Sequence, residues 1–150
     1  MELILWRHAD AEPGEPDLDR ALSATGVRQA ERVGAWLDAR LPRTARVLVS
    51  PAHRAQQTAR TLRREFRIVS ELAPGASVGT VLGVAGWPDA REPSLIVGHQ
   101  PTLGATVAWL LSGVDASWSI VPGALWWLSG RMREHEVAVA VKAVIAPDCV

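Results

Sequence analysis

The sequence predicts a three-layer α/β/α sandwich, an α/β fold with a mostly parallel central sheet of about six strands. Short apolar runs alternate with amphipathic helical stretches over most of the chain, which is typical of parallel strands joined by crossover helices. The chain has 150 residues, of which 48% are hydrophobic and 21% charged. These are the proportions of a globular domain of ordinary size, and we expect a single domain over residues 1–150.

The first strand and the first helix are separated by a loop. An apolar run predicts a buried strand over residues 2–6 that ends at Arg7 and His8, and proline, glycine and acidic residues indicate a loop over 10–19. Ser23 suits the N-cap of a helix that extends to about residue 40. Apolar side chains recur in this helix at helical spacing, at Val27, Ala30, Val33, Leu37 and Leu41.

The second strand, over residues 46–49, leads directly into a second helix. Ser50 can cap that helix and Pro51 suits its first position. We expect the helix over residues 52–65, with an apolar side formed by Ala55, Ala59, Leu62 and Phe66.

The third and fourth strands follow in the middle of the chain. Residues 67–69 indicate a weak third strand, and the glycine-containing segment 73–86 has room for one short helix. Residues 94–97 predict the fourth strand. A helix after it shows apolar residues at Leu103, Val107, Leu110 and Leu111.

Two late strands complete the prediction. They are expected over residues 124–128 and 136–144, joined through a polar turn at Gly130–Arg133.

Two arginines and two histidines are predicted to meet at one edge of the sheet. Right-handed crossovers place the first, second and fourth strands side by side, or nearly so, in one direction. In such sheets ligands bind outside the carboxyl ends of the strands. The residues there are Arg7, His8, Arg54 and His99, beside the N-termini of two helices. Because arginine pairs bidentately with phosphate oxygens, the pattern indicates a phosphate pocket.

Each of these residues also has a structural interpretation. His8 could be a histidine at the edge of the core that is bonded to the backbone, Arg54 a solvated charge, and His99 a loop residue before the helix. Arg7 beside His8 favours the functional interpretation, because an arginine at the inner end of a strand needs an anionic partner.

Composition and missing motifs argue against several other classes. The 16 basic residues balance the 16 acidic ones, which argues against nucleic-acid and membrane partners, and no apolar stretch is long enough to span a bilayer. We expect a cytoplasmic protein. His53 and His135 are interpreted as structural or surface residues. With Cys149 as the one cysteine and no His-Glu-x-x-His motif, no metal site is expected. No nucleotide cofactor is expected either, because the phosphate-binding glycine motifs are missing.

Four stretches together resemble the histidine phosphatase (phosphoglycerate mutase-like) superfamily. Residues 5–9, Leu-Trp-Arg-His-Ala, resemble its Arg-His-Gly signature, and residues 97–99 resemble its second histidine motif. Residues 20–30 are similar to its Arg-x-Leu-Thr/Ser-x-x-Gly-x-x-Gln-Ala stretch, and residues 50–59 to its Ser-Pro-x-x-Arg-Ala-x-Gln-Thr-Ala block. The resemblance extends to about residue 111. The short chain, Asp10-Ala11 and His99-Gln100-Pro101 are most similar to its SixA branch of phosphohistidine phosphatases.

The resemblance implies a role for each residue of the pocket. His8 would be the nucleophile that becomes transiently phosphorylated. Arg7, Arg54 and His99 would hold the phosphoryl oxygens, and Arg20 would lie at the substrate rim. Phosphoryl transfer depends mainly on positioning and charge stabilisation, which agrees with these residue types. No metal and no cofactor are implied.

The resemblance also implies a partner, a protein that carries phosphohistidine, such as a phosphotransfer domain or a phosphocarrier. Two alternatives stay open at this point. The same pocket could serve a small sugar or nucleotide phosphate, or it could bind phosphate without turnover. The sequence leaves the oligomeric state open.

Two positions depart from the family pattern. Ala9 stands where the signature has glycine, which adds a methyl group and restricts the backbone beside His8. Many family members have an acidic residue after the third strand as the acid for an alcohol leaving group. Here Glu71 is the only carboxylate in that segment and precedes the usual place, which leaves Asp10 and Glu12 as substitutes.

Overall fold

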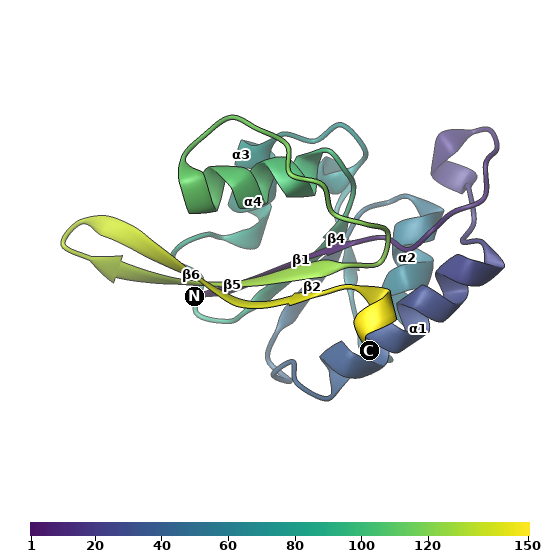
Figure 1. The fold of residues 1–150 in the computed structure, drawn as a ribbon, viewed down its shortest axis with the longest axis horizontal. Helices are drawn as coiled ribbons and strands as arrows, with labels where there is room; N and C mark the ends of the chain where they lie inside the picture. The colour runs from purple at the N-terminus through teal and green to yellow at the C-terminus, as the bar shows by residue number, and fades with distance from the viewer.

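The computed structural model describes all of residues 1–150, with one six-stranded sheet and four α-helices (Figure 1). The strands are β1 (Glu2–Arg7), β2 (Arg46–Val49), β3 (Arg67–Ile68), β4 (Ser94–Gly98), β5 (Leu125–Arg133) and β6 (Glu136–Ile145). The helices are α1 (Ala24–Asp38), α2 (His53–Arg60), α3 (Val78–Ala85) and α4 (Thr102–Ser112). Single 3-10 turns lie at Asp17–Asp19, Ser70–Leu72 and Pro147–Cys149. None of the helices has the length and apolar character needed to cross a bilayer.

The strand order confirms the predicted arrangement of the sheet. The order is β3-β2-β4-β1-β5-β6. The first four strands in sequence pair in parallel, and β5 and β6 pair antiparallel. β1, β4 and β2 are therefore direct neighbours with their carboxyl ends at one edge. The mostly parallel sheet of the prediction is confirmed, and the late hairpin supplies its antiparallel part.

Helices cover both faces of the sheet, which gives the three predicted layers. In Figure 1, α1 and α2 lie on one side of the sheet and α3 and α4 on the other. β1 shows why both faces are covered, since its successive side chains point to opposite faces. Ile4 and Trp6 pack with residues of α1 and α2, and Leu3 and Leu5 pack with residues of α3 and α4.

Helix α1 begins as predicted, but its buried side differs in the first turn. The Ser23 hydroxyl accepts a hydrogen bond from the Gly26 amide at 3.0 Å, which confirms the N-cap. Val27, expected in the apolar stripe, is 40% exposed. The reason is that Gly26 and Ala30 face inward there, where Gly26 lies directly against the backbone of Asp10.

Helix α2 is shorter than predicted at both ends. It begins at His53 after Ala52 and ends at Arg60. Ser50 does not cap it, because its hydroxyl accepts from the Ala52 amide and also contacts His99. At the other end Arg63 adopts a left-handed backbone with φ of 53°, which is incompatible with a continuing helix.

The prediction of a turn at Gly130–Arg133 is wrong. These residues belong to β5, and the turn is made by Glu134 and His135, both with positive φ. Two left-handed residues form the tight turn that matches the twist of a hairpin. Gly130 has a packing role instead, since a Cβ atom there would overlap the ring of Trp87.

Candidate active site

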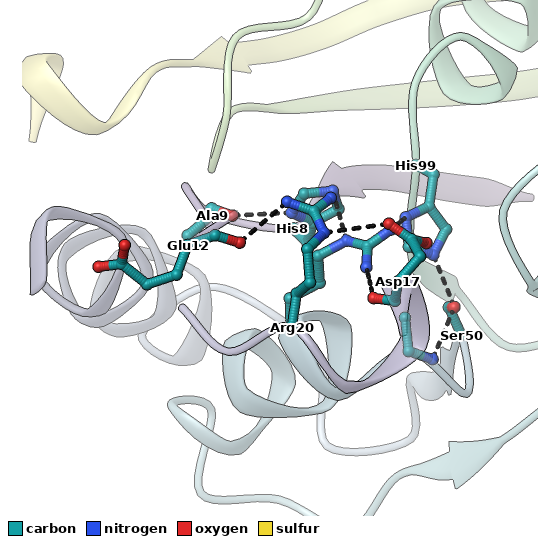
Figure 2. Close-up of polar contacts among 9 residues, drawn as sticks. His8, Ala9, Glu12, Asp17, Arg20, Ser50 and His99 are labelled. Carbon is teal, nitrogen blue, oxygen red and sulfur yellow. Dashed lines mark hydrogen bonds and ion pairs between the residues drawn. The ribbon is translucent and has the colours of Figure 1, made fainter. Parts of the chain in front are cut away.

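The four predicted pocket residues meet at the carboxyl ends of β1, β2 and β4. Arg7 ends β1 and His8 follows it, Arg54 lies in the first turn of α2, and His99 follows β4. The His8 and His99 rings lie 5.1 Å apart between centroids (Figure 2). Arg54 contacts both, with its Nε 3.3 Å from His8 Nε2 and its Nη2 3.4 Å from His99 Nδ1. The side chains thus come from segments up to 92 positions apart because the parallel strands end together.

His8 is held as a neutral imidazole with an unprotonated Nε2. Its Nδ1 lies 2.7 Å from the Ala9 carbonyl oxygen, which can only accept, so Nδ1 carries the proton. Nε2 is then the acceptor that faces Arg54 Nε. Burial lowers the pKa of His8 to about 4, assisted by the charge of Arg54 and opposed by the bond to Ala9. An unprotonated Nε2 is the form that can attack an electrophile.

His99 is oriented by Ser50. Its Nε2 lies 2.6 Å from the Ser50 hydroxyl, and its Nδ1 faces the Arg54 guanidinium, which can only donate. Nε2 therefore donates to Ser50, whose oxygen also accepts from the Ala52 amide. Burial lowers the pKa of His99 to about 3, and the neighbouring His8 and Arg54 act in the same direction.

Arg7 has an unused hydrogen-bond donor. Its Nη1 donates to the Ile120 carbonyl oxygen at 2.7 Å, while its buried Nε has no partner. Burial lowers the pKa of Arg7, opposed by the charge of Asp10, yet an arginine stays protonated near neutral pH. A buried cationic donor without a partner destabilises the fold unless an anion accepts its hydrogen bond.

These residues surround a small polar cavity of about 240 Å³. It is lined by Arg7, His8, Asp10, Ala11, Arg20, Arg54, Pro74, His99, Gln100 and Pro122. A larger groove, of about 1040 Å³, lies at the amino ends of β2 and β3 and contains none of the histidines. The lining favours an anion, because three arginines face the cavity and no group of three His, Cys, Asp or Glu could hold a metal ion.

Asp17, which the sequence analysis did not single out, is the ion-pair partner of Arg54. Its backbone oxygen accepts from Arg54 Nη1 at 2.8 Å, and its Oδ2 accepts from Arg54 Nη2 at 3.1 Å. Its Oδ1 accepts from Arg20 Nε at 3.0 Å, and Arg20 also donates to the Glu12 carbonyl oxygen. Arg20, the residue expected at the substrate rim, lines the cavity wall, and its contact with a substrate stays a prediction. The one available signal for Asp17 was that a buried arginine at position 54 needs a carboxylate partner.

The motif residues around the cavity hold the segment that follows His8. The Thr58 hydroxyl accepts from the Ala9 amide at 3.1 Å and donates to the Arg54 carbonyl oxygen, so it links two motifs. The Gln29 side chain accepts from the Asp10 amide at 2.9 Å. Ala9 is fully buried against Leu22 and Ala30. Its φ is not positive, so the structure accommodates alanine where the signature has glycine.

The other titratable residues considered above lie in different places. Asp10 lines the cavity, and its Oδ2 accepts from the Ser23 hydroxyl at 2.6 Å. Glu12 and Glu71 are exposed and do not line the cavity, so Asp10 is the only one of the three carboxylates near His8. His53 is half-buried outside the cavity, and His135 is exposed in the hairpin turn.

Comparison with known proteins gives consistent matches. Residues 3–75 match the model of the histidine phosphatase superfamily (branch 1). An uncharacterized protein of Mycobacterium tuberculosis is 41% identical over 117 residues, which cover 74% of each chain. Phosphohistidine phosphatase SixA of Escherichia coli is 30% identical over 122 residues, which cover 75% of this chain and 76% of that protein.

A solved structure shows the same fold over nearly the whole length. A SixA-type protein from Nakamurella multipartitia superposes with a TM-score of 0.81 at 28% identity. The match covers 97% of this chain and 95% of the other. The late hairpin, which the family model does not include, is therefore part of the shared architecture.

Proposed function

This chain belongs to the histidine phosphatase superfamily, on its SixA-like branch, and we propose that it removes the phosphoryl group from phosphohistidine on a partner protein. The proposal treats residues 1–150 as one catalytic domain. The observation that supports it most is the unprotonated Nε2 of His8, which borders a polar cavity walled by Arg7, Arg54 and His99.

In the proposed first step, His8 Nε2 attacks the phosphorus of the substrate. A bond forms between phosphorus and Nε2, the bond from phosphorus to the substrate ring nitrogen breaks, and that nitrogen takes the electron pair. The phosphorylated His8 carries a positive ring, which the bond from Nδ1 to the Ala9 carbonyl stabilises. Because one phosphorus–nitrogen bond replaces another, the step is close to balanced in energy.

In the second step, water attacks the phosphorus of phospho-His8. The electron pair of the broken bond returns to Nε2, and the proton of the water passes to the released phosphate. Arg7 and Arg54 supply positive charge for the phosphoryl oxygens, a task that divalent ions perform in metallophosphatases. Neutral His99 has an acceptor nitrogen toward Arg54, so it donates to phosphate only after it gains a proton there.

The leaving group supports phosphohistidine over a phosphate ester. An alkoxide needs an acid to leave. Asp10 is the one carboxylate that lines the cavity, and its Oδ2 accepts a hydrogen bond from Ser23 instead of donating a proton. The imidazole of phosphohistidine takes up a proton near neutral pH and leaves without such an acid. The cavity is also below the range of about 300–1000 Å³ usual for small-molecule sites, which suits a side chain presented by another protein.

The test is acid-labile phosphoenzyme formation with a labelled phosphohistidine-bearing phosphotransfer domain. Wild type should form a phosphoenzyme that is lost in acid and stable in base, and His8→Ala should form none and show no turnover. His53→Ala, beside Arg54 but outside the cavity, is the matched control and should retain activity. Turnover by His8→Ala would contradict the mechanism.

The substrate class is tested by comparing kcat/KM for that domain with a panel of sugar and nucleotide monophosphates. We expect the phosphoprotein to be preferred. A monophosphate that is preferred by tenfold, about 1.4 kcal/mol of transition-state free energy, would replace the substrate assignment and leave the catalytic residues in place.

A further inference from the structure

The guanidinium of Arg54 uses two adjacent edges that share Nη2. The edge formed by Nε and Nη2 faces the two histidines, at 3.3 Å from His8 Nε2 and 3.4 Å from His99 Nδ1. The edge formed by Nη1 and Nη2 faces Asp17, which accepts one hydrogen bond with its backbone oxygen and one with its carboxylate. Arg54 lines the cavity and Asp17 does not. The two edges thus have different surroundings, one the cavity and the other the loop before α1.

We infer that Asp17 is a positioning residue that acts through Arg54: by holding the far edge of the guanidinium, it turns the Nε and Nη2 edge toward the phosphoryl group. This inference rests on the proposed function in that the phosphoryl group occupies the cavity. An arginine recognises phosphate through two parallel hydrogen bonds, so the orientation of its plane determines whether both bonds form.

Arg54 depends on Asp17 for this orientation. The Arg54 side chain is only 4% exposed, and Asp17 is its one ion-pair partner. Both acceptors for the far edge come from Asp17, which lies 37 positions away in the chain. Asp17 is itself held by Arg20, whose Nε donates to its second carboxylate oxygen. A chain of contacts therefore runs from Arg20 through Asp17 to Arg54, and Figure 2 shows its first link, between Arg20 and Asp17.

An alternative interpretation of this contact is that Asp17 competes with phosphate for Arg54. The geometry argues against it, because Asp17 occupies the Nη1 and Nη2 edge, which leaves Nε and the second hydrogen atom of Nη2 for the side of the histidines. The charge of Asp17 opposes an incoming anion only weakly, since its side chain is 51% exposed and solvent screens it. The hydrogen bond from Arg54 lowers the pKa of Asp17, so the carboxylate is ionised at neutral pH and remains an acceptor.

The experiment measures orthophosphate affinity by calorimetry, and kcat and KM with the phosphotransfer domain, for Asp17→Ala and Asp17→Asn. The matched control is Asp19→Ala, an acidic residue of the same 3-10 turn. We expect Asp17→Ala to weaken phosphate binding at least tenfold and to lower kcat. Asp17→Asn should recover most of both, because an amide oxygen can still accept from Nη2. The phosphate affinity and the kcat of Asp19→Ala should stay within about twofold of the wild-type values.

Three outcomes would overturn the inference. The first is that Asp17→Ala has the same phosphate affinity and kcat as Asp19→Ala. The second is that Asp17→Asn binds phosphate as weakly as Asp17→Ala. The third is tighter phosphate binding by Asp17→Ala, which would identify Asp17 as a competitor of phosphate. Urea unfolding of each variant shows whether a loss reflects the fold instead of the site. If wild type binds phosphate but turns over no phosphohistidine, the proposed function fails, and the phosphate affinities still decide the role of Asp17.

Discussion

The buried neutral His8 should make the stability of the fold depend on pH. Burial lowers the pKa of His8 to about 4, whereas an imidazole in the unfolded chain titrates near 6.5. Below about pH 6.5 the unfolded chain therefore binds a proton that the folded chain does not, and stability falls as the pH falls. His8 is only 8% exposed, so solvent does little to weaken this effect.

The size of the effect follows from these two pKa values. Between about pH 7.5 and about pH 5, proton linkage at His8 removes about 2 kcal/mol of unfolding free energy. Groups that do not interact with His8 add a pH dependence that cancels in a comparison with His8→Ala. His99 is the exception, because His8 contributes to the lowering of its pKa. The stability of wild type minus that of His8→Ala should therefore fall by about 2 kcal/mol over this pH range.

Urea unfolding followed by tryptophan fluorescence gives both free energies, because the chain has seven tryptophans. His135→Ala, in the exposed hairpin turn, controls for loss of a histidine without loss of a buried one. If the difference in unfolding free energy between wild type and His8→Ala stays constant within about 0.5 kcal/mol over this pH range, His8 is not buried in its neutral form. The argument for an unprotonated Nε2 then fails.

Three further predictions concern the site and its support. Arg54→Lys keeps the charge but cannot span four acceptors, so kcat/KM should fall by about tenfold to a hundredfold in steady-state assays; an unchanged value would contradict the role of the guanidinium edges. Gly26→Ala should destabilise the fold by about 2 kcal/mol or more in urea unfolding, because the new Cβ overlaps the Asp10 backbone; a neutral result would show that α1 can shift there. Turnover should persist after exhaustive EDTA treatment, and activity that returns only with Mg²⁺ or Zn²⁺ would contradict the proposal of arginine-based charge stabilisation.

Local sequence patterns were sufficient to predict the layers and the position of the site. Apolar runs marked where β1, β2 and β4 end, and the handedness of crossovers then brought Arg7, His8, Arg54 and His99 to one edge. These features depend on short-range periodicity and on a general rule of chain topology. Both can be read without knowing which side chains touch.

Only the tertiary structure decided how those side chains are held. Ser50 looked like a helix cap from its neighbours in the chain, yet its hydroxyl orients His99, which lies 49 positions away. Asp17 looked like one acid among several in a loop, yet it holds Arg54 across 37 positions. Local pattern determines which residues enter an element. The partner of a buried polar group is instead set by what the whole fold leaves within hydrogen-bond distance once water is excluded.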